Sequence, residues 1–291
     1  EGRGAALVHN NFGNVLGHLG KYEESVPHYQ QAIELSGGSS WAYNNIANAF
    51  YSLKRYEESL AARRKALAYN PGDSEQWGCL TTVLFHLKRW EACIEMARLG
   101  LEIDPENALL WSNLGSGLAQ KGEFDEASRA IEKAWRLQPE EAYYRNEWLD
   151  FLKRRNRWPD ALAAYEEIRA KDAKAYQADY ALALYHTGKR EESYSACKVY
   201  AEMDPKQPIA WYNVACLSCL TNRRDECFAM LKRYLEAGGK NLKMVENEPD
   251  FTSVRDSAEF KAFLEALRQA AGAAAEPGKP VEPEKPAEPK A

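Results

Sequence analysis

The sequence predicts an all-α protein built from a tandem series of antiparallel helix pairs, and three recurring columns of residues predict it. An aromatic residue returns every 34 residues, a small side chain follows it three residues later, and a proline ends most units. Repetition at this period is typical of helical repeat architectures. The aromatic column is Tyr22, Tyr56, Trp90, Phe124 and Trp158; the small column is Ser25, Ser59, Cys93, Ala127, Ala161, Ser193 and Cys227; the prolines are Pro71, Pro105, Pro139 and Pro205.

The fourth unit shows how one helix pair arises. Trp111, Leu114 and Leu118 lie at helical spacing and give one apolar face. Gly122 interrupts the pattern, and a second apolar face that includes Ile131 follows it. A proline then stops the second helix, because its ring cannot continue the backbone hydrogen bonding. Small residues in a fixed column allow the two helices of the pair to approach each other closely.

These residues at these offsets resemble the tetratricopeptide repeat. The resemblance covers residues 1–237 and implies a right-handed superhelical solenoid of antiparallel helix pairs. Arg145, Arg190 and Arg224 stand where the family usually has an aromatic residue, and the fifth unit is two residues short. We therefore expect looser packing between residues 141 and 205. The seven units begin near Ala6, Ser40, Ser74, Ala108, Ala142, Lys174 and Pro208.

Two further segments follow the repeats. Residues 238–270 resemble the segment that closes many bacterial arrays of this family, where it would cover the apolar face of the last repeat. Asp256 and Glu259 predict the start of its terminal helix, as in a capping box. Residues 271–291 consist of Ala, Pro, Glu, Lys and Gly with a single large aliphatic residue. Such a segment cannot bury enough surface to offset its ordering entropy, so we expect a disordered tail.

Composition and charge narrow the classes of function. A nucleic-acid-binding protein usually carries a surplus of basic residues, whereas this chain has a formal net charge of -5 at pH 7. No stretch has the roughly 20 apolar residues of a membrane span. We expect a protein partner and a cytoplasmic location, and leave the oligomeric state open. Because residue 1 is Glu, a mature periplasmic or secreted chain that has lost a signal peptide is the alternative location.

The motifs of common catalytic and cofactor sites do not occur in the sequence. It has no Gly-Lys-Ser/Thr phosphate loop and no His-Glu-x-x-His. Cys216 and Cys219 have the spacing of redox and zinc sites, but no second pair or nearby histidine accompanies them. We interpret all six cysteines as reduced apolar residues inside helices. His18, His86 and His186 share a column in separate units, too far apart to bind one metal. We predict no enzyme activity, no cofactor and no metal site.

Asparagine is the residue type that stands out. In tetratricopeptide proteins the first helix of each unit lines the groove, so the resemblance implies which residues face a bound peptide. An asparagine amide can donate to and accept from a peptide backbone, whatever the peptide's side chains are. The alternative is that these asparagines are merely consensus residues of the repeat. The groove candidates are Asn10, Asn11, Asn14, Trp41, Asn44, Asn45, Asn48, Tyr51 and Asn113.

The sequence thus predicts a non-catalytic scaffold that binds an extended peptide or partner protein in its groove. The family's carboxylate clamp of lysine, asparagine and arginine lacks its basic residues here, so we expect no such clamp. The alternative function is an accessory repeat region of a larger enzyme, of glycosyltransferase or protein kinase type, with its catalytic domain upstream of Glu1. If the asparagines do not bind, the fifth unit around Glu147, Asp150, Lys153 and Arg154 is the next candidate surface.

Overall fold

The computed structural model describes residues 2–272, and within them the secondary structure is sixteen α-helices and one 3-10 helix, with no strand. Of the expected tail, Ala271 and Gly272 still belong to the last helix, whereas residues 273–291 lie outside the described part. None of the helices in the described range has the length and apolar character needed to cross a membrane.

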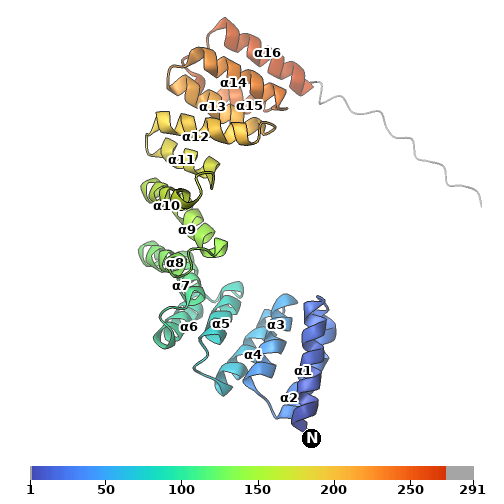
Figure 1. Cartoon of the computed structure of the whole chain (residues 1–291). Helices are drawn as coiled ribbons and strands as arrows, with labels where there is room; N and C mark the ends of the chain where they lie inside the picture. The colour runs from blue at the N-terminus through green and yellow to red at the C-terminus, as the bar shows by residue number, and fades with distance from the viewer. Residues whose placement is uncertain (1, 273–291) are drawn as a thin grey trace, which may run out of the picture. The chain divides into compact units, whose positions relative to one another are not determined.

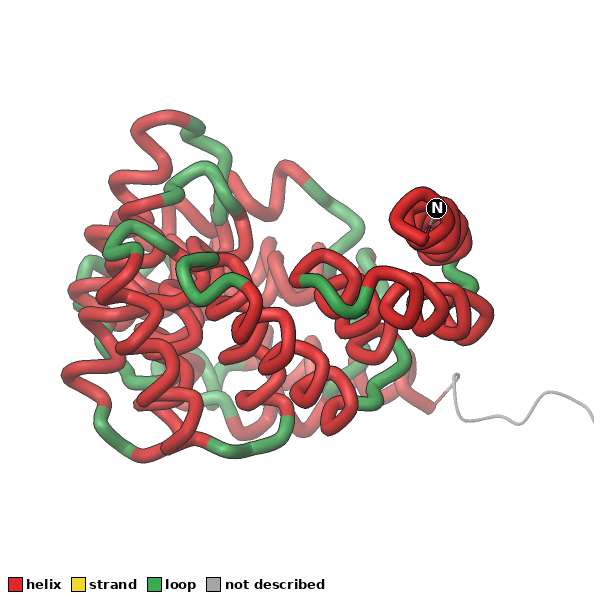
Figure 2. Tube along the Cα trace, turned by 90° about the horizontal axis from the view of Figure 1, so that it is seen from below, coloured by secondary structure: helices red, strands yellow, loops and turns green. Residues whose placement is uncertain are grey.

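The chain divides into two compact units, an N-terminal unit, Glu1–Arg155, and a C-terminal unit, Asn156–Ala291. The division falls between the two helices of the fifth repeat, inside the stretch where the motif residues depart from the pattern. Within each unit the consecutive helices of the repeats pack against each other, and short loops join them (Figures 1 and 2).

The N-terminal unit contains α1 (Gly2–His18), α2 (Tyr22–Ser36), α3 (Ser40–Ser52), α4 (Tyr56–Tyr69), α5 (Ser74–His86), α6 (Trp90–Ile103), α7 (Ala108–Lys121), α8 (Phe124–Leu137) and α9 (Ala142–Arg154). The C-terminal unit contains α10 (Trp158–Lys171), α11 (Gln177–His186), α12 (Arg190–Met203), α13 (Pro208–Leu220), α14 (Arg224–Glu236), α15 (Leu242–Asn247), η1 (Pro249–Phe251) and α16 (Ala258–Gly272). Helix α11 begins three residues after the predicted start of its repeat, because Tyr176 has a left-handed backbone.

The predicted columns correspond to fixed places in each helix pair. The aromatic residues Tyr22 to Trp158 are each the first residue of a second helix. All seven members of the small column, from Ser25 to Cys227, are 0% exposed. A side chain at the closest point between two helices must be small, and the Ser, Cys and Ala of this column satisfy that condition.

A further column recurs in the turns between the two helices of each pair. One residue in every such turn has positive φ, and its type varies although its position does not. Left-handed backbone is strained for any residue with a Cβ, and glycine alone avoids this strain. These residues are Gly20, Lys54, Lys88, Gly122, Asn156, Gly188 and Asn222.

Polar contacts also recur from repeat to repeat. The indole N–H of Trp111 donates to the carbonyl of Pro105 (2.8 Å), and Trp77 and Trp211 make the same contact with the prolines six residues before them. A second recurring contact joins the basic residue before a second helix to a glutamate of the preceding repeat. Such exposed ion pairs contribute little to stability. These pairs are Arg55–Glu23, Arg89–Glu57 and Arg223–Glu191.

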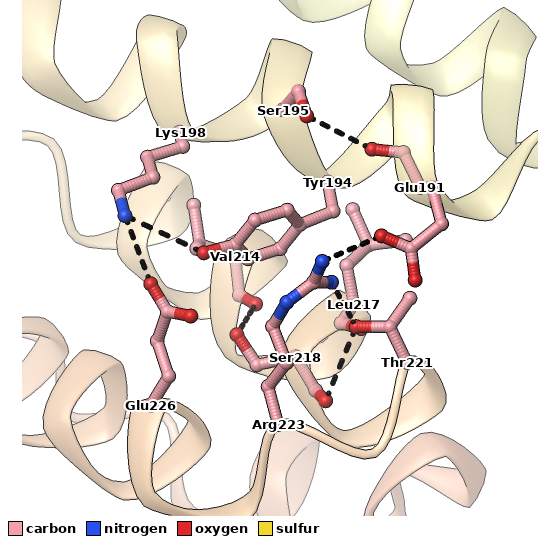
Figure 3. A network of polar contacts seen from close by, with 10 residues as sticks. All are labelled: Glu191, Tyr194, Ser195, Lys198, Val214, Leu217, Ser218, Thr221, Arg223 and Glu226. Atoms are coloured by element: carbon pink, nitrogen blue, oxygen red, sulfur yellow. Dashed lines mark hydrogen bonds and ion pairs between the residues drawn. The ribbon is translucent and has the colours of Figure 1, made fainter.

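Figure 3 shows the last of these ion pairs in its surroundings. Arg223 donates to Glu191 (2.6 Å) and to the Thr221 hydroxyl (2.7 Å), and its guanidinium lies 4.2 Å from the ring centroid of Tyr194. The Lys198 ammonium pairs with Glu226 (2.9 Å) on the other side of the same ring. Helix α12 is thus linked to the following helix pair by contacts at two points.

The segment after α14 packs on the last repeat. Phe251 and Phe260 are 0% exposed with their rings 5.5 Å apart, and the ring of Tyr212 lies 5.8 Å from Phe251. The predicted helix cap at Asp256 is wrong by one residue: the Ser257 hydroxyl accepts from the Phe260 N–H (3.2 Å), and α16 begins after it. The aromatic residues therefore hold this segment against α13.

The prediction of six reduced cysteines is wrong for two of them. Cys219 at the end of α13 and Cys227 in the first turn of α14 form a disulfide, with their Cα atoms 5.6 Å apart. The two residues lie in columns that face each other across the interhelical turn, a proximity that their spacing of eight residues does not reveal. Cys216 is not paired with Cys219; it is a free, buried thiol, as are Cys93 and Cys197.

The positive φ of the turn residues predicts that two glycine substitutions change the stability of the protein in opposite directions. Gly122→Ala should destabilise the protein by about 1 kcal/mol, because alanine is strained at φ 85° although its Cβ would meet no atom there. Gly4→Ala, at an open position inside α1, should instead stabilise by about 0.5–1 kcal/mol. Urea unfolding followed by circular dichroism measures both. Equal effects of the two substitutions would contradict the assigned turn geometry.

Candidate functional site

The six asparagine candidates of the first two repeats lie at three equivalent positions of the first helices. Asn10 and Asn44 share one position, Asn11 and Asn45 the next, and Asn14 and Asn48 the one a helical turn further. All six lie on α1 and α3 of the N-terminal unit. Positions four residues apart lie on one helix face, so Asn10 with Asn14 and Asn44 with Asn48 form two parallel rows of amides.

A cavity of about 380 Å³ opens between α1, α2 and α3. Three of the predicted residues, Asn14, Asn45 and Asn48, line it together with His18 and Tyr29. Its lining is mainly amide, hydroxyl and imidazole groups. It can therefore hydrogen-bond a polar ligand, and no pair of carboxylates suited to acid–base chemistry lines it.

Arg63 of α4 contacts two amides of α3, those of Asn44 and Asn48, and no sequence motif pointed to it. Its guanidinium donates to the side-chain oxygens of Asn44, Asn48 and Gln76, the last at 2.9 Å. Only 3% of Arg63 is exposed, and within residues 2–272 it forms no ion pair. Burial lowers the pKa of its guanidinium. Its Nε is buried without a hydrogen-bond partner among the described residues.

Arg63 fixes the orientation of two amides. A guanidinium only donates hydrogen bonds, so Asn44 and Asn48 must turn their oxygens towards it. Their Nδ2 groups then remain as donors, since neither makes a hydrogen bond to any residue in the range 2–272. The amides of α1 are held by other partners. Asn45 Nδ2 donates to Asn10 Oδ1 (2.8 Å), and the Tyr29 hydroxyl donates to Asn14 Oδ1 (3.0 Å).

The remaining groove candidates are not gathered at this cavity. Asn11 is exposed, and Trp41 is 37% exposed on α3. The Tyr51 hydroxyl is 2.8 Å from Nε2 of His86, an exposed imidazole. Asn113 is buried, and its Nδ2 contacts the Gly78 carbonyl and the hydroxyls of two threonines of α5 at 2.8–3.1 Å. The amide of Asn113 therefore joins α7 to α5.

A signal for Arg63 was present in the repeat register. The equivalent residue of the other six repeats is uncharged and buried in every case: Tyr29, Ala97, Ile131, Tyr165, Cys197 and Leu231. A charged residue in a core position must find polar partners, because an unpaired buried charge is very unfavourable. Arg63 is therefore the one charged residue at its position among the seven second helices. The asparagines are likewise unusual residues among the first helices.

The fifth repeat carries a carboxylate at the Asn45 position. Glu147 is half-buried and accepts hydrogen bonds from the hydroxyls of Ser112 (2.6 Å) and Ser116 (2.5 Å). Burial raises the pKa of Glu147, and these two hydrogen bonds only partly oppose the shift. On the same helix, Asp150 forms an ion pair with Lys153 (2.9 Å). This surface is charged but largely self-paired.

Family models described as tetratricopeptide repeat match residues 4–70 and residues 149–208. No curated protein sequence matches the chain.

Solved structures share the fold. MamA from Desulfovibrio magneticus RS-1 is 16% identical, with 59% of this chain and 97% of that chain covered and a TM-score of 0.52. YrrB, a TPR protein with an unusual peptide-binding site, is 20% identical, with 62% and 94% covered and a TM-score of 0.52. The pilF protein of Pseudomonas aeruginosa is 17% identical, with 91% and 100% covered and a TM-score of 0.50. At these identities the likeness establishes the fold alone.

The raised pKa of Glu147 predicts a pH-dependent effect of Glu147→Gln. The folded state favours the protonated carboxyl, so the wild type should lose stability as pH rises from the ordinary glutamate pKa, 4.5, through the raised value. Glutamine remains neutral, so the variant should gain stability relative to the wild type over that interval. Urea unfolding at several pH values measures the difference. The exposed Glu95→Gln serves as control; a pH-independent difference for Glu147→Gln would contradict the assignment.

Proposed function

Because this chain is a tetratricopeptide repeat protein, we propose that it is a non-catalytic protein–protein interaction scaffold whose first two repeats bind an extended peptide segment. The partner is a protein or peptide rather than a nucleic acid, in keeping with the net charge of -5. No catalytic residue, cofactor or metal is assigned.

The observation that carries the proposal is the set of oriented amides at the cavity between α1, α2 and α3. Asn48 lines the cavity and has its oxygen held by Arg63, so its Nδ2 is a donor of fixed direction. Asn44 is held in the same way, one helical turn before it. Groups that are oriented before binding lose less conformational entropy on binding, and affinity rises accordingly.

Each amide then has a definite part in holding the peptide backbone. The Nδ2 groups of Asn44 and Asn48 donate to peptide carbonyls. Asn45 donates its own Nδ2 to Asn10 and offers its oxygen to a peptide N–H. Trp41, 37% exposed on the same helix, supplies an apolar contact. We assign Asn113 to the packing of α7 on α5 rather than to this site.

The alternative, an accessory region of a glycosyltransferase or protein kinase, differs only in what is joined to these repeats. Sequencing the full-length gene decides between the two: a catalytic domain encoded upstream of Glu1 supports the alternative.

The oriented amides predict the effect of Asn48→Asp. Aspartate still accepts from Arg63, so the fold is retained, but the outward donor is replaced by an acceptor that repels peptide carbonyls. A buried hydrogen bond contributes about 0.5–1.5 kcal/mol, and an unpaired partner costs about 1–3 kcal/mol. Peptide affinity should therefore fall roughly tenfold or more. The measurement is calorimetric titration of a peptide selected from a random library against the whole chain.

The matched control is Asn70→Asp, an exposed asparagine after α4 that does not line the cavity. A second variant, Asn45→Ala with Asn48→Ala, removes the two amides that α3 contributes to the cavity and should weaken binding at least as much. Because the contacts are made by neutral amides, added salt should change the affinity of an uncharged peptide little. If every selected peptide binds all variants equally, the asparagines are consensus residues and the surface around Glu147 becomes the next candidate.

A further inference from the structure

A second cavity, of about 230 Å³, lies within the C-terminal unit where α11 and α13 meet the segment after the last repeat. It lies on the same face of the first helices as the amide rows. Ala178 and Leu182 occupy the positions that Asn44 and Asn48 hold in the second repeat, and Tyr212 and Cys216 occupy them in the last repeat. At these two positions the groove face is therefore apolar and aromatic, while Asn213 at the Asn45 position also lines the cavity.

One wall of this cavity is acidic, and it comes from the closing segment rather than from a repeat. Glu248 and Asp250 line the cavity just before and within η1. The Tyr212 hydroxyl donates to Glu248 Oε2 (2.7 Å), and the Asp250 backbone N–H contacts Glu248 Oε1 (3.4 Å), so the Glu248 carboxylate is held in place. The Asp250 carboxylate has no hydrogen bond or ion pair to any residue within 2–272. Ligating atoms of Cys216, Glu248 and Asp250 lie within 4.8 Å of one another.

Neither carboxylate forms an ion pair with a residue in the range 2–272, although the Arg255 guanidinium donates to the backbone carbonyl of Glu248 (2.5 Å). Burial raises the pKa of Asp250, and the charge of Glu248 raises it further; Arg190 opposes the shift without forming an ion pair. The pKa of the neighbouring Tyr185 is raised mainly by burial, and the charges of Asp250 and Glu248 raise it further. A positive group placed between Glu248 and Asp250 would be attracted by both, in a partly desolvated site where the attraction is stronger than in water.

The rim of the cavity is suited to a side chain with an apolar stem. Leu182 is 42% exposed and Tyr185 36% exposed, and both line the cavity. Lysine and arginine carry a charged head on an aliphatic stem, and the face of a tyrosine ring attracts cations. A liquid water molecule occupies about 30 Å³, so the cavity has far more room than a bare metal ion requires.

We propose that this cavity binds a lysine or arginine side chain of a partner polypeptide, with the stem against Leu182 and Ala178 and the cation between Glu248 and Asp250. This acidic pocket does not rest on the proposed peptide site in the N-terminal unit. The pocket gives the scaffold a second binding site. This site binds a charged side chain, whereas the amide rows hydrogen-bond a peptide backbone.

The test uses the whole chain with labelled alanine and leucine methyl groups, titrated in the NMR spectrometer to millimolar peptide. The probe is acetyl-Ala-Ala-Lys-Ala-Ala-amide, and its neutral counterpart carries norleucine in place of lysine. The lysine peptide should shift the methyl signals of Ala178, Ala181 and Leu182, and the norleucine peptide should not. Asp250→Asn should lower the affinity for the lysine peptide at least about tenfold, since hydrogen bonds to charged groups are stronger than those between neutral groups.

The matched control is Asp225→Asn, which removes an exposed carboxylate of α14 outside the cavity. This variant should bind the lysine peptide like the wild type. Unchanged methyl signals in the free variants verify folding. The proposal is overturned if no cavity methyl shifts, if both peptides shift them equally, or if Asp250→Asn binds as tightly as the wild type. It is also overturned if zinc ion alone binds stoichiometrically, is lost in Cys216→Ser, and the lysine peptide has no effect. The Asn48→Asp readout in the N-terminal unit is unaffected by any of these results.

Discussion

The close approach of the two helices within each pair is the constraint on which the rest of this structure depends. It occurs at the small column, whose seven members are all 0% exposed. In the fourth repeat Gly115 takes part as well: a Cβ there would come within 2.5 Å of Ile131 Cγ1 and about 3 Å of the backbone of α8. Because side chains at the contact cannot grow, the relative rotation of the two helices is fixed. The face of the first helix that remains uncovered is therefore the same in every repeat.

This fixed face lets the chain vary its groove residues without altering the packing. In the first two repeats the face carries amides, in the fifth the carboxylate of Glu147, and in the last two apolar and aromatic residues such as Leu182 and Tyr212 beside Asp179 and Asn213. Stability in such arrays is close to a sum of the contributions of single repeats and neighbouring interfaces. A change at one groove position therefore affects mainly its own repeat and the neighbouring interfaces, and different side-chain chemistries can occupy this position in different repeats of one chain.

The sequence predicted whatever depends on residue type at a fixed period. The aromatic column marked the first residue of the second helix in the first five repeats, and the small column marked the buried contact in all seven. It did not predict the left-handed turn residues, because Lys88 and Gly122 share a backbone conformation but no side-chain chemistry. The Cys219–Cys227 disulfide was missed as well, because it depends on which columns meet across a turn. Neither Arg63 beneath the amides nor Glu248 beside Cys216 follows from a pattern within one helix. Such contacts between elements become visible only once the repeats are folded.

Arg63 is difficult to explain by stability alone. Six of the seven equivalent positions hold uncharged buried residues, and replacing a buried charge with a well-packed apolar side chain is often neutral or stabilising. The guanidinium has amide oxygens in place of a carboxylate, and one of its N–H groups has no partner within residues 2–272. A buried charge among otherwise apolar equivalents breaks a local rule, and such exceptions are expected at functional sites. Its effect on the two amides is directional: an obligate donor at this position holds the oxygens of both Asn44 and Asn48, and their Nδ2 groups have no hydrogen-bond partner within residues 2–272. A buried leucine would pack as well and leave those amides free to turn.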